Sequence, residues 1–181
     1  MQSESELIKR AKKHDGEAFS LLYEANFERV FRYIKFKVGS QPEAEDMTQQ
    51  VFVKAYEALP SFKDVSFSGW LMKIAHNLIV DYLRKKSKRQ TVCLDELPLA
   101  SDENPVLVVE QKSDVAWLKE ALGRLTPAQQ EVITLRFGSE LPIAEVARIL
   151  GKSEGAVKAL QHSALEALRR IRYEEGRGKK S

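Results

Sequence analysis

Apolar residues recur at helical spacing along almost the whole first half of the chain. The first such stripe consists of Phe19, Leu22, Tyr23, Phe27, Val30, Phe31 and Ile34. This spacing places apolar side chains on one face of a helix, so it predicts a long amphipathic helix. The helix is expected to end at the GSQP stretch, residues 39–42, because glycine and proline interrupt helical backbone.

Two further helices are predicted before residue 90. The stretch EAEDMTQQVFVKAYEAL carries one apolar line, which Pro60 ends: Met47, Val51, Ala55 and Leu59. The next helix follows a loop at residues 61–69, and its expected inward line is Ile74, Leu78 and Tyr82. This choice leaves a polar face on the other side: Lys73, His76, Asn77, Asp81 and Arg84. The helix ends in a run of positive charge: Arg84, Lys85, Lys86, Lys88 and Arg89.

The helical pattern is lost between residues 91 and 112. This acidic stretch holds two prolines and has no sustained period, which predicts an irregular linker between two small helical domains. Helical period returns at Val115, Leu118, Leu122 and Leu125. No useful stretch alternates as a strand would, so the expected fold is all-α. The expected organisation is a domain at residues 1–90, a linker at 91–112, a domain at 113–175 and a basic tail at 176–181.

The second domain contains a strong helix start. In TPAQ, residues 126–129, Thr126 is a typical N-cap and the proline suits the first turn. Gln129 stands where it can complete a capping box with Thr126. The helix that follows is expected to end at Gly138.

A helix-turn-helix is the most specific pattern in the chain. Residues 142–170 place apolar side chains on the inner faces of two helices: Ile143, Val146, Ala147, Leu150, Val157, Leu160, Ala164 and Leu168. Gly151 permits the sharp turn between them, and Ser153 caps the second helix. Small Ala147 lets the helices cross closely, and Val157 fills the angle between them. This arrangement is typical of a motif whose second helix enters the major groove of DNA.

The residues that would face DNA follow from this geometry: Ser153, Glu154, Lys158, Ala159, Gln161 and His162. Lys158 can reach a guanine edge or a phosphate, Gln161 could pair with adenine, and Ala159 could touch a thymine methyl. Nearby arginines suit phosphates: Arg136, Arg169, Arg170 and Arg172. The alternative is a plain helical hairpin with a solvated polar face, and His162 by itself could equally be a surface residue.

The first domain offers two candidate surfaces. One is a polar stripe with Phe52 beside it, formed by Asp46, Gln49, Gln50 and Val53. It suits a partner helix, although residue types alone favour a solvated face. The other combines an aromatic loop with the basic helix that carries His76 and Asn77. Apolar walls, hydrogen-bonding groups and positive charge suit single-stranded DNA with unstacked bases, and the alternative is a solvated helix with a lysine-rich end.

The overall composition narrows the chemistry. The 181 residues include 29 Lys and Arg against 26 Asp and Glu, so the distribution of charge matters more than the net +3. The single Cys93 excludes a disulfide framework, and three histidines far apart show no ligand spacing, so no metal or other cofactor is expected. The chain lacks a signal-peptide core and a run long enough to span a membrane, which predicts a cytoplasmic protein.

The order of these motifs resembles a bacterial RNA polymerase sigma factor of the sigma-70 family, in the two-domain, extracytoplasmic-function group. The resemblance covers about residues 5–172 and rests on AEDMTQQVFVKAYEALPSF, GWLMKIAHNLIVDYLRKKSKR, the acidic linker and LTPAQQEVITLRF with the helix-turn-helix. It implies a non-enzymatic subunit that binds core RNA polymerase, recognises −10 and −35 promoter elements and promotes DNA melting. The implied partners are the β′ clamp helices and β flap of the polymerase, promoter DNA and an anti-sigma factor.

The resemblance also implies roles for particular residues. Core-polymerase binding is implied for Asp46, Gln49, Gln50 and Phe52. Recognition of the melted −10 element is implied for Phe62, Lys63, Phe67, Trp70, Lys73, His76, Asn77, Arg84, Lys85, Lys86, Lys88 and Arg89. Recognition of the −35 element is implied for Arg136, Ser153, Glu154, Lys158, Ala159, Gln161, His162 and Ser163. The family often has an acidic residue at the position of Gln50 and an arginine at that of Ser163.

Two other functions remain open from the residues alone. A helix-turn-helix regulator with an N-terminal sensor domain would bind duplex DNA as a dimer, and its first half should show a pocket or a dimer seam. A DNA-processing enzyme is disfavoured because no carboxylate cluster, phosphate-binding loop or nucleophile–base arrangement is present. Asp81 is better interpreted as pairing along its own helix with Arg84 or Lys85.

Overall fold

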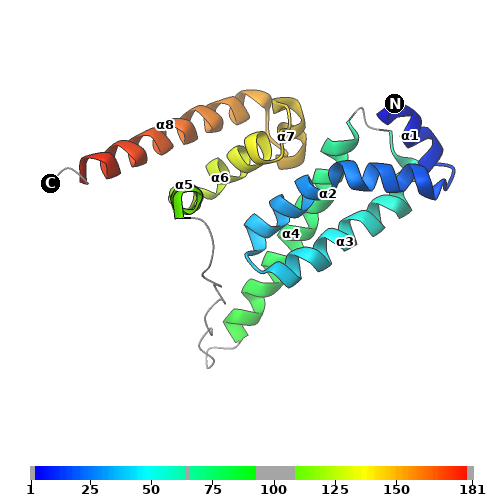
Figure 1. The fold of residues 1–181 in the computed structure, drawn as a ribbon, viewed down its shortest axis with the longest axis horizontal. Helices are drawn as coiled ribbons and strands as arrows, with labels where there is room; N and C mark the ends of the chain where they lie inside the picture. The colour runs from blue at the N-terminus through cyan, green and yellow to red at the C-terminus, as the bar shows by residue number, and fades with distance from the viewer. Residues whose placement is uncertain (1–2, 64–65, 93–108, 179–181) are drawn as a thin grey trace. The chain divides into compact units, whose positions relative to one another are not determined.

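The computed structural model describes residues 3–63, 66–92 and 109–178 of the chain. These residues form helices and connecting turns without any strand, which confirms the all-α prediction. The chain divides into two compact units, Met1–Leu99 and Ala100–Ser181. Figure 1 shows the helices of both units along the chain.

The first unit is a bundle around one long helix, α2. Its elements are α1 (Glu4–Ala11), α2 (Gly16–Val38), α3 (Gln41–Ala58), the short 3₁₀ helix η1 (Leu59–Ser61) and α4 (Phe67–Val92). Helix α2 packs against α1, α3 and α4, and α3 also packs against α4 (Figure 1). The four α-helices therefore share one core.

The core of this unit lies where α2, α3 and α4 meet. Its largest fully buried side chains are Leu22, Val30, Tyr33, Ile34, Val51, Leu59, Phe67, Leu71, Met72 and Ile79. Burying an aliphatic or aromatic side chain of this size contributes about 1.5–3 kcal/mol. The predicted stripe on α2 and the predicted line on α3 both face this core. The stripe ends where predicted, at Gly39, whose positive φ of 78° closes α2.

Helix α4 turns a different face inward from the predicted one. Its buried residues include Leu71, Met72, Ala75 and Ile79, each at most 1% exposed. The predicted inward residues Ile74, Leu78 and Tyr82 are only half-buried and lie at the edge of the contact. Small Ala75 lets α4 approach its neighbours closely. The centre of the buried face therefore follows Ala75 and Ile79, one position after the predicted line of Ile74 and Leu78. The prediction for this helix face was wrong.

The second unit contains α5 (Val109–Gly123), α6 (Pro127–Ile133), a π-helical turn η2 (Thr134–Gly138), α7 (Ile143–Leu150) and α8 (Glu154–Gly178). The predicted capping box is present. Thr126 Oγ1 accepts a hydrogen bond from the Gln129 amide at 3.3 Å, and Gln129 Oε1 accepts one from the Thr126 amide at 3.1 Å. The helix start was therefore predicted correctly from four residues.

The helix-turn-helix of α7 and α8 has the predicted geometry. Gly151 adopts the left-handed conformation, with φ 61° and ψ 36°, at the end of α7. Ser153 Oγ accepts a hydrogen bond from the Ala156 amide at 3.1 Å and so caps α8. Val146 and Val157 are fully buried where the two helices cross. Gly151 thus forms the predicted turn, and Ser153 forms the predicted helix cap.

The ends of the expected linker differ from the helix bounds. Helix α4 continues to Val92 and α5 begins at Val109, so both ends of the 91–112 segment are helical. The remaining expectations for that segment, including the one for Cys93, fall outside the described residues.

Candidate nucleic-acid interface

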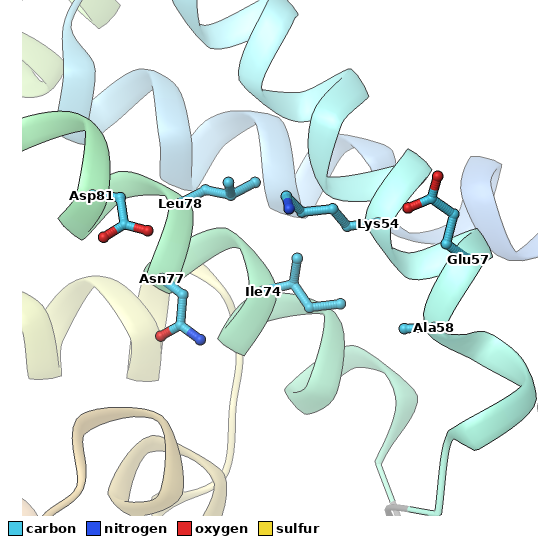
Figure 2. A pocket seen from close by; sticks show the side chains of 7 residues that line it. All are labelled: Lys54, Glu57, Ala58, Ile74, Asn77, Leu78 and Asp81. Carbon is cyan, nitrogen blue, oxygen red and sulfur yellow. The ribbon is translucent and has the colours of Figure 1, made fainter.

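A pocket of about 530 Å³ opens between α3 and α4. Its lining is Lys54, Glu57, Ala58, Ile74, Asn77, Leu78 and Asp81. Figure 2 shows these residues in two groups, the first three on α3 and the others on α4, with Leu78 extending toward Lys54. The pocket is therefore formed by side chains from two helices that are separate in sequence.

The chemistry of this pocket suits a flat, polar-edged ligand. Ile74 and Leu78 form apolar walls, and the exposed amide of Asn77 can both donate and accept hydrogen bonds. Lys54 and Glu57 bring one charge of each sign from the opposite helix. An unstacked nucleobase has an apolar face and an edge of donors and acceptors, so these groups match its needs.

A second, slightly smaller depression follows the outer face of α3. It is lined by Asp46, Gln49, Gln50, Val53, Lys54 and Glu57 and has a volume of about 470 Å³. Lys54 and Glu57 also line the first pocket, so the two depressions adjoin at these residues. Val53 is 57% exposed among these polar groups. A partner protein that docks on α3 could bury this apolar side chain.

The C-terminal part of α4 carries dense positive charge. Arg84, Lys85, Lys86, Lys88 and Arg89 are all exposed. Cations at the C-terminal end of a helix are also favoured by the helix dipole. This segment therefore offers several ammonium and guanidinium groups to phosphates without any change of fold.

The exposed face of α8 follows directly after the turn of the helix-turn-helix. Glu154, Lys158, Ala159 and His162 are exposed on it. His162 Nε2 lies 3.4 Å from a carboxylate oxygen of Glu166, one turn further along. Arg169 and Arg170 are exposed further along the same helix. This face has the size and the polar groups of a major-groove reading helix.

Both units match known families. The family model for Sigma-70 region 2 matches residues 22–89, and the model for Sigma-70 region 4 matches residues 121–170. The ECF RNA polymerase sigma factor BldN of Streptomyces coelicolor is 37% identical over 176 residues, covering 95% of this chain and 67% of its own length. The ECF RNA polymerase sigma factor SigW of Bacillus subtilis is 30% identical, covering 90% of this chain and 93% of its own. The chain belongs to the ECF RNA polymerase sigma factors.

A solved structure supports the fold of this sigma factor. RpoE from Bartonella quintana, in complex with the anti-sigma factor NepR, is 22% identical with a TM-score of 0.68 and covers 84% of this chain and 95% of its own. The family membership confirms the resemblance seen in the sequence. The protein is a promoter-specific transcription initiation factor that acts with core RNA polymerase, and it is not an enzyme.

Three aromatic residues expected on the −10 surface have a structural role in this sigma factor. Phe62 and Phe67 are 6% and 1% exposed, and their ring centres lie 5.9 Å apart. Trp70 is half-buried, 4.9 Å from Phe62. Large aromatic side chains gain most by leaving water, so these three rings pack against one another near the start of α4. The expectation that Phe62 and Phe67 offer their faces to DNA is corrected accordingly.

His76 and Phe52 also point away from the expected surfaces. His76 Nδ1 lies 3.0 Å from the hydroxyl oxygen of Tyr33, a core residue of α2, so this ring is held at the α2–α4 contact. Phe52 is 4% exposed, and its ring centre lies 4.5 Å from that of Tyr23. Phe52 on α3 and His76 on α4 therefore pack toward the core. They help to hold these helices in place and are not part of the exposed surfaces.

Three predicted −35 residues turn at least partly toward the interior of the second unit. Ser163 Oγ accepts a hydrogen bond from Gln129 Nε2 and donates one to the Leu160 carbonyl, both at 3.1 Å. Arg136 Nη1 donates to the Leu141 carbonyl at 3.0 Å, so its guanidinium is turned toward the protein. Gln161 is half-buried, with its Oε1 covered. The exposed face of α8 is therefore narrower than the predicted one.

The sequence interpretation missed the α3 side of the pocket. Lys54 lies one turn beyond Gln50, the last amide of the polar stripe, and Glu57 and Ala58 lie about two turns beyond it. Extending the stripe at the same spacing could have found them. The predicted pair along α4 is confirmed, since Arg84 Nη2 lies 3.0 Å from Asp81 Oδ1.

The described residues lack two further features. Within residues 3–63, 66–92 and 109–178, no three metal-ligating side chains come together. No helix in that part of the chain is long and apolar enough to cross a membrane.

Proposed function

We propose that the pocket between α3 and α4 binds one unstacked base of the −10 element and that Asn77 reads its edge. The observation that carries the proposal is an exposed amide on an apolar-walled pocket inside the region 2 match. Binding a base there favours the melted strand over the duplex, because only a melted strand can release a base from its stack. Melting is then driven by binding energy.

The charged residues around this pocket hold the strand. Lys63, Lys73 and the basic end of α4, Arg84 to Arg89, are exposed and suit backbone phosphates. Trp70, half-buried at the start of α4, packs against Phe62 and Phe67 and helps to hold that end of the helix in place. These contacts position the DNA, whereas Asn77 selects the base.

Docking on core polymerase falls to the outer face of α3. Asp46, Gln49 and Gln50 supply hydrogen-bonding groups, and Val53 adds apolar area. Phe52 acts indirectly by holding α3 in place. The β′ clamp helices are the proposed partner, and neutral Gln50 offers them an amide in place of a carboxylate.

The −35 element is read by α8. Lys158, Ala159 and His162 face the bases, with Glu154 beside them, while Ser153 caps the helix. Arg169 and Arg170 suit phosphates further along. Residues 1–90 thus form the −10 and polymerase-binding domain, 113–175 the −35 domain that meets the β flap, 91–112 the linker and 176–181 a basic tail.

The proposal also includes binding of an anti-sigma factor and a location in the cytoplasm. A protein of the same fold is known in complex with the anti-sigma factor NepR, and the α3 depression with exposed Val53 is a surface that such a partner could cover. A sigma factor works where the polymerase and the chromosome are, which places it in the cytoplasm.

Reconstitution tests the proposal. The purified protein is mixed with bacterial core RNA polymerase and fragmented genomic DNA of the source organism, and transcript 5′ ends are mapped. Starts that depend on the protein and share two spaced elements are expected. Absence of new starts, together with tight duplex binding by the protein alone, would instead support a helix-turn-helix regulator.

A further inference from the structure

A third cavity of the first unit lies between α1 and the connection from α3 to α4. Its volume is about 280 Å³, and it is lined by Glu4, Ser5, Ile8, Lys9, Lys12, Phe62 and Lys63. Three lysines against one glutamate make this cavity positively charged. Helix α1 has no part in the surfaces described above, so they do not explain Lys9 on this helix or Lys12 directly after it.

Lys12 fixes the position of α1 at this cavity. Its ammonium donates a hydrogen bond to the Phe62 carbonyl oxygen and lies 5.5 Å from the centre of the Phe62 ring. Lys12 is thus a structural contact. Lys9 lies one turn earlier on α1, and Lys63 directly follows Phe62. Among the described residues, neither Lys9 nor Lys63 belongs to a salt bridge.

The cavity lies close to the proposed base pocket along the chain. Ala58 lines the base pocket, and Phe62, four residues later, lines the cavity. Four residues span at most about 14 Å even when extended. A B-form strand advances about 3.4 Å per nucleotide, so a strand with one base in the pocket can reach the cavity within roughly four nucleotides.

We infer that Lys9 of α1 joins Lys63, already proposed above, in binding backbone phosphates of the single strand whose unstacked base enters the α3–α4 pocket. The inference rests on the proposed function of that pocket and adds α1 to the DNA-binding surface. Lysine ammonium groups bind phosphate oxygens as compact point charges and read no base. Glu4 opposes this binding, because its carboxylate lines the same cavity.

A salt titration of the complete polymerase complex tests the inference. Full-length protein is assembled with core RNA polymerase, and its affinity is measured for a promoter fragment from a mapped start whose −10 region is kept unpaired by mismatches. The variants are Lys9→Gln, Lys63→Gln, the double variant and Glu4→Gln. Lys13→Gln is the matched control, because Lys13 is exposed just beyond α1 and does not line the cavity.

Each lysine variant should flatten the plot of log affinity against log salt by about 0.7, the contribution of one phosphate of a single strand. The double variant should lose about twice that slope, and Glu4→Gln should bind more tightly than the parent. Lys13→Gln should match the parent. Circular dichroism should show the same helix content for all variants.

The outcomes separate two failures. If the parent complex binds the unpaired fragment but Lys9→Gln behaves like Lys13→Gln, the inference is wrong and the base pocket stands. If Lys9→Gln weakens assembly with core polymerase instead, the cavity is a protein contact and the inference is also wrong. If the parent complex itself does not prefer the unpaired fragment to the duplex, the proposed function fails and the inference fails with it.

Discussion

The two units present their candidate DNA contacts in different ways. In the second unit, Lys158, Ala159 and His162 stand on one exposed face of a single helix, α8. In the first unit, the pocket takes Lys54 and Glu57 from α3 and Asn77 from α4. A duplex displays its base edges in a groove, so one helix face is enough to read it. An unstacked base must be surrounded, and this requires walls from more than one helix.

This difference explains where sequence interpretation worked. The turn of the second unit depends on neighbours in sequence, namely Gly151 and the cap at Ser153, and both were predicted. The pocket of the first unit depends on which face of α4 is buried, and that choice was wrong. A surface on one element is determined locally, whereas a pocket between elements is determined by packing.

Loss of core packing should have the largest effect. Leu71→Ala removes a fully buried side chain from α4 and should lower the free energy of unfolding by about 2–5 kcal/mol. Val80→Ala on the same helix is the control, because Val80 is 48% exposed and its loss should cost under about 0.5 kcal/mol. Chemical denaturation followed by circular dichroism measures both. Equal costs would mean that the buried face of α4 is not the one described.

Base selection should depend on Asn77 and not on its neighbour. Asn77→Ala should relax selectivity at one −10 position by about 1–3 kcal/mol, measured by transcription from promoters substituted at each position. His76→Ala should lower stability with no change of selectivity, because His76 contacts Tyr33 in the core. A change of base preference in His76→Ala would overturn the corrected role of that residue. Unchanged selectivity in Asn77→Ala would remove the base-reading proposal.

Phosphate contacts on α4 should act evenly across sequences. Changing Lys85 and Lys86 together to alanine should weaken promoter binding and reduce the salt slope by about 1.4–1.8, because two phosphate contacts are lost. Filter binding on several promoters at a series of salt concentrations measures this. A loss confined to some sequences would show that these lysines read bases.

The smallest expected effect is a pH dependence of folding stability, which arises from Tyr82 of α4 and its contact with Glu43 of α3. Burial, with a hydrogen bond to Glu43, raises the pKa of Tyr82 to about 12. The protonated phenol is therefore favoured in the folded state, and its contribution to stability is complete below pH about 10 and is lost as the pH rises toward 12. Tyr82→Phe should flatten the fall in stability over that window relative to the parent. Parallel curves would show that folding does not raise the pKa of Tyr82.

Much of this protein could be read from its sequence. The all-α fold, the α2 stripe, the capping box at Thr126 and the helix-turn-helix all follow from spacing over fewer than thirty neighbouring residues. The order of motifs was enough to identify the family, which the region 2 and region 4 matches confirm. Local spacing carries this information because helix formation, capping and tight turns depend on residues close in the chain.

Only the tertiary structure decided which of those residues reach a surface. Phe62, Phe67, Phe52 and His76 have the right types for contact with a partner, yet packing against α2 and its neighbours directs them inward. In the second unit, Ser163 makes hydrogen bonds to Gln129 and Leu160 within its own fold. The same apolar and hydrogen-bonding groups serve a core or an interface equally well. Whether such a group is buried in the core or exposed at an interface depends on the position of the other helices. The spacing of residues within one helix does not reveal that position.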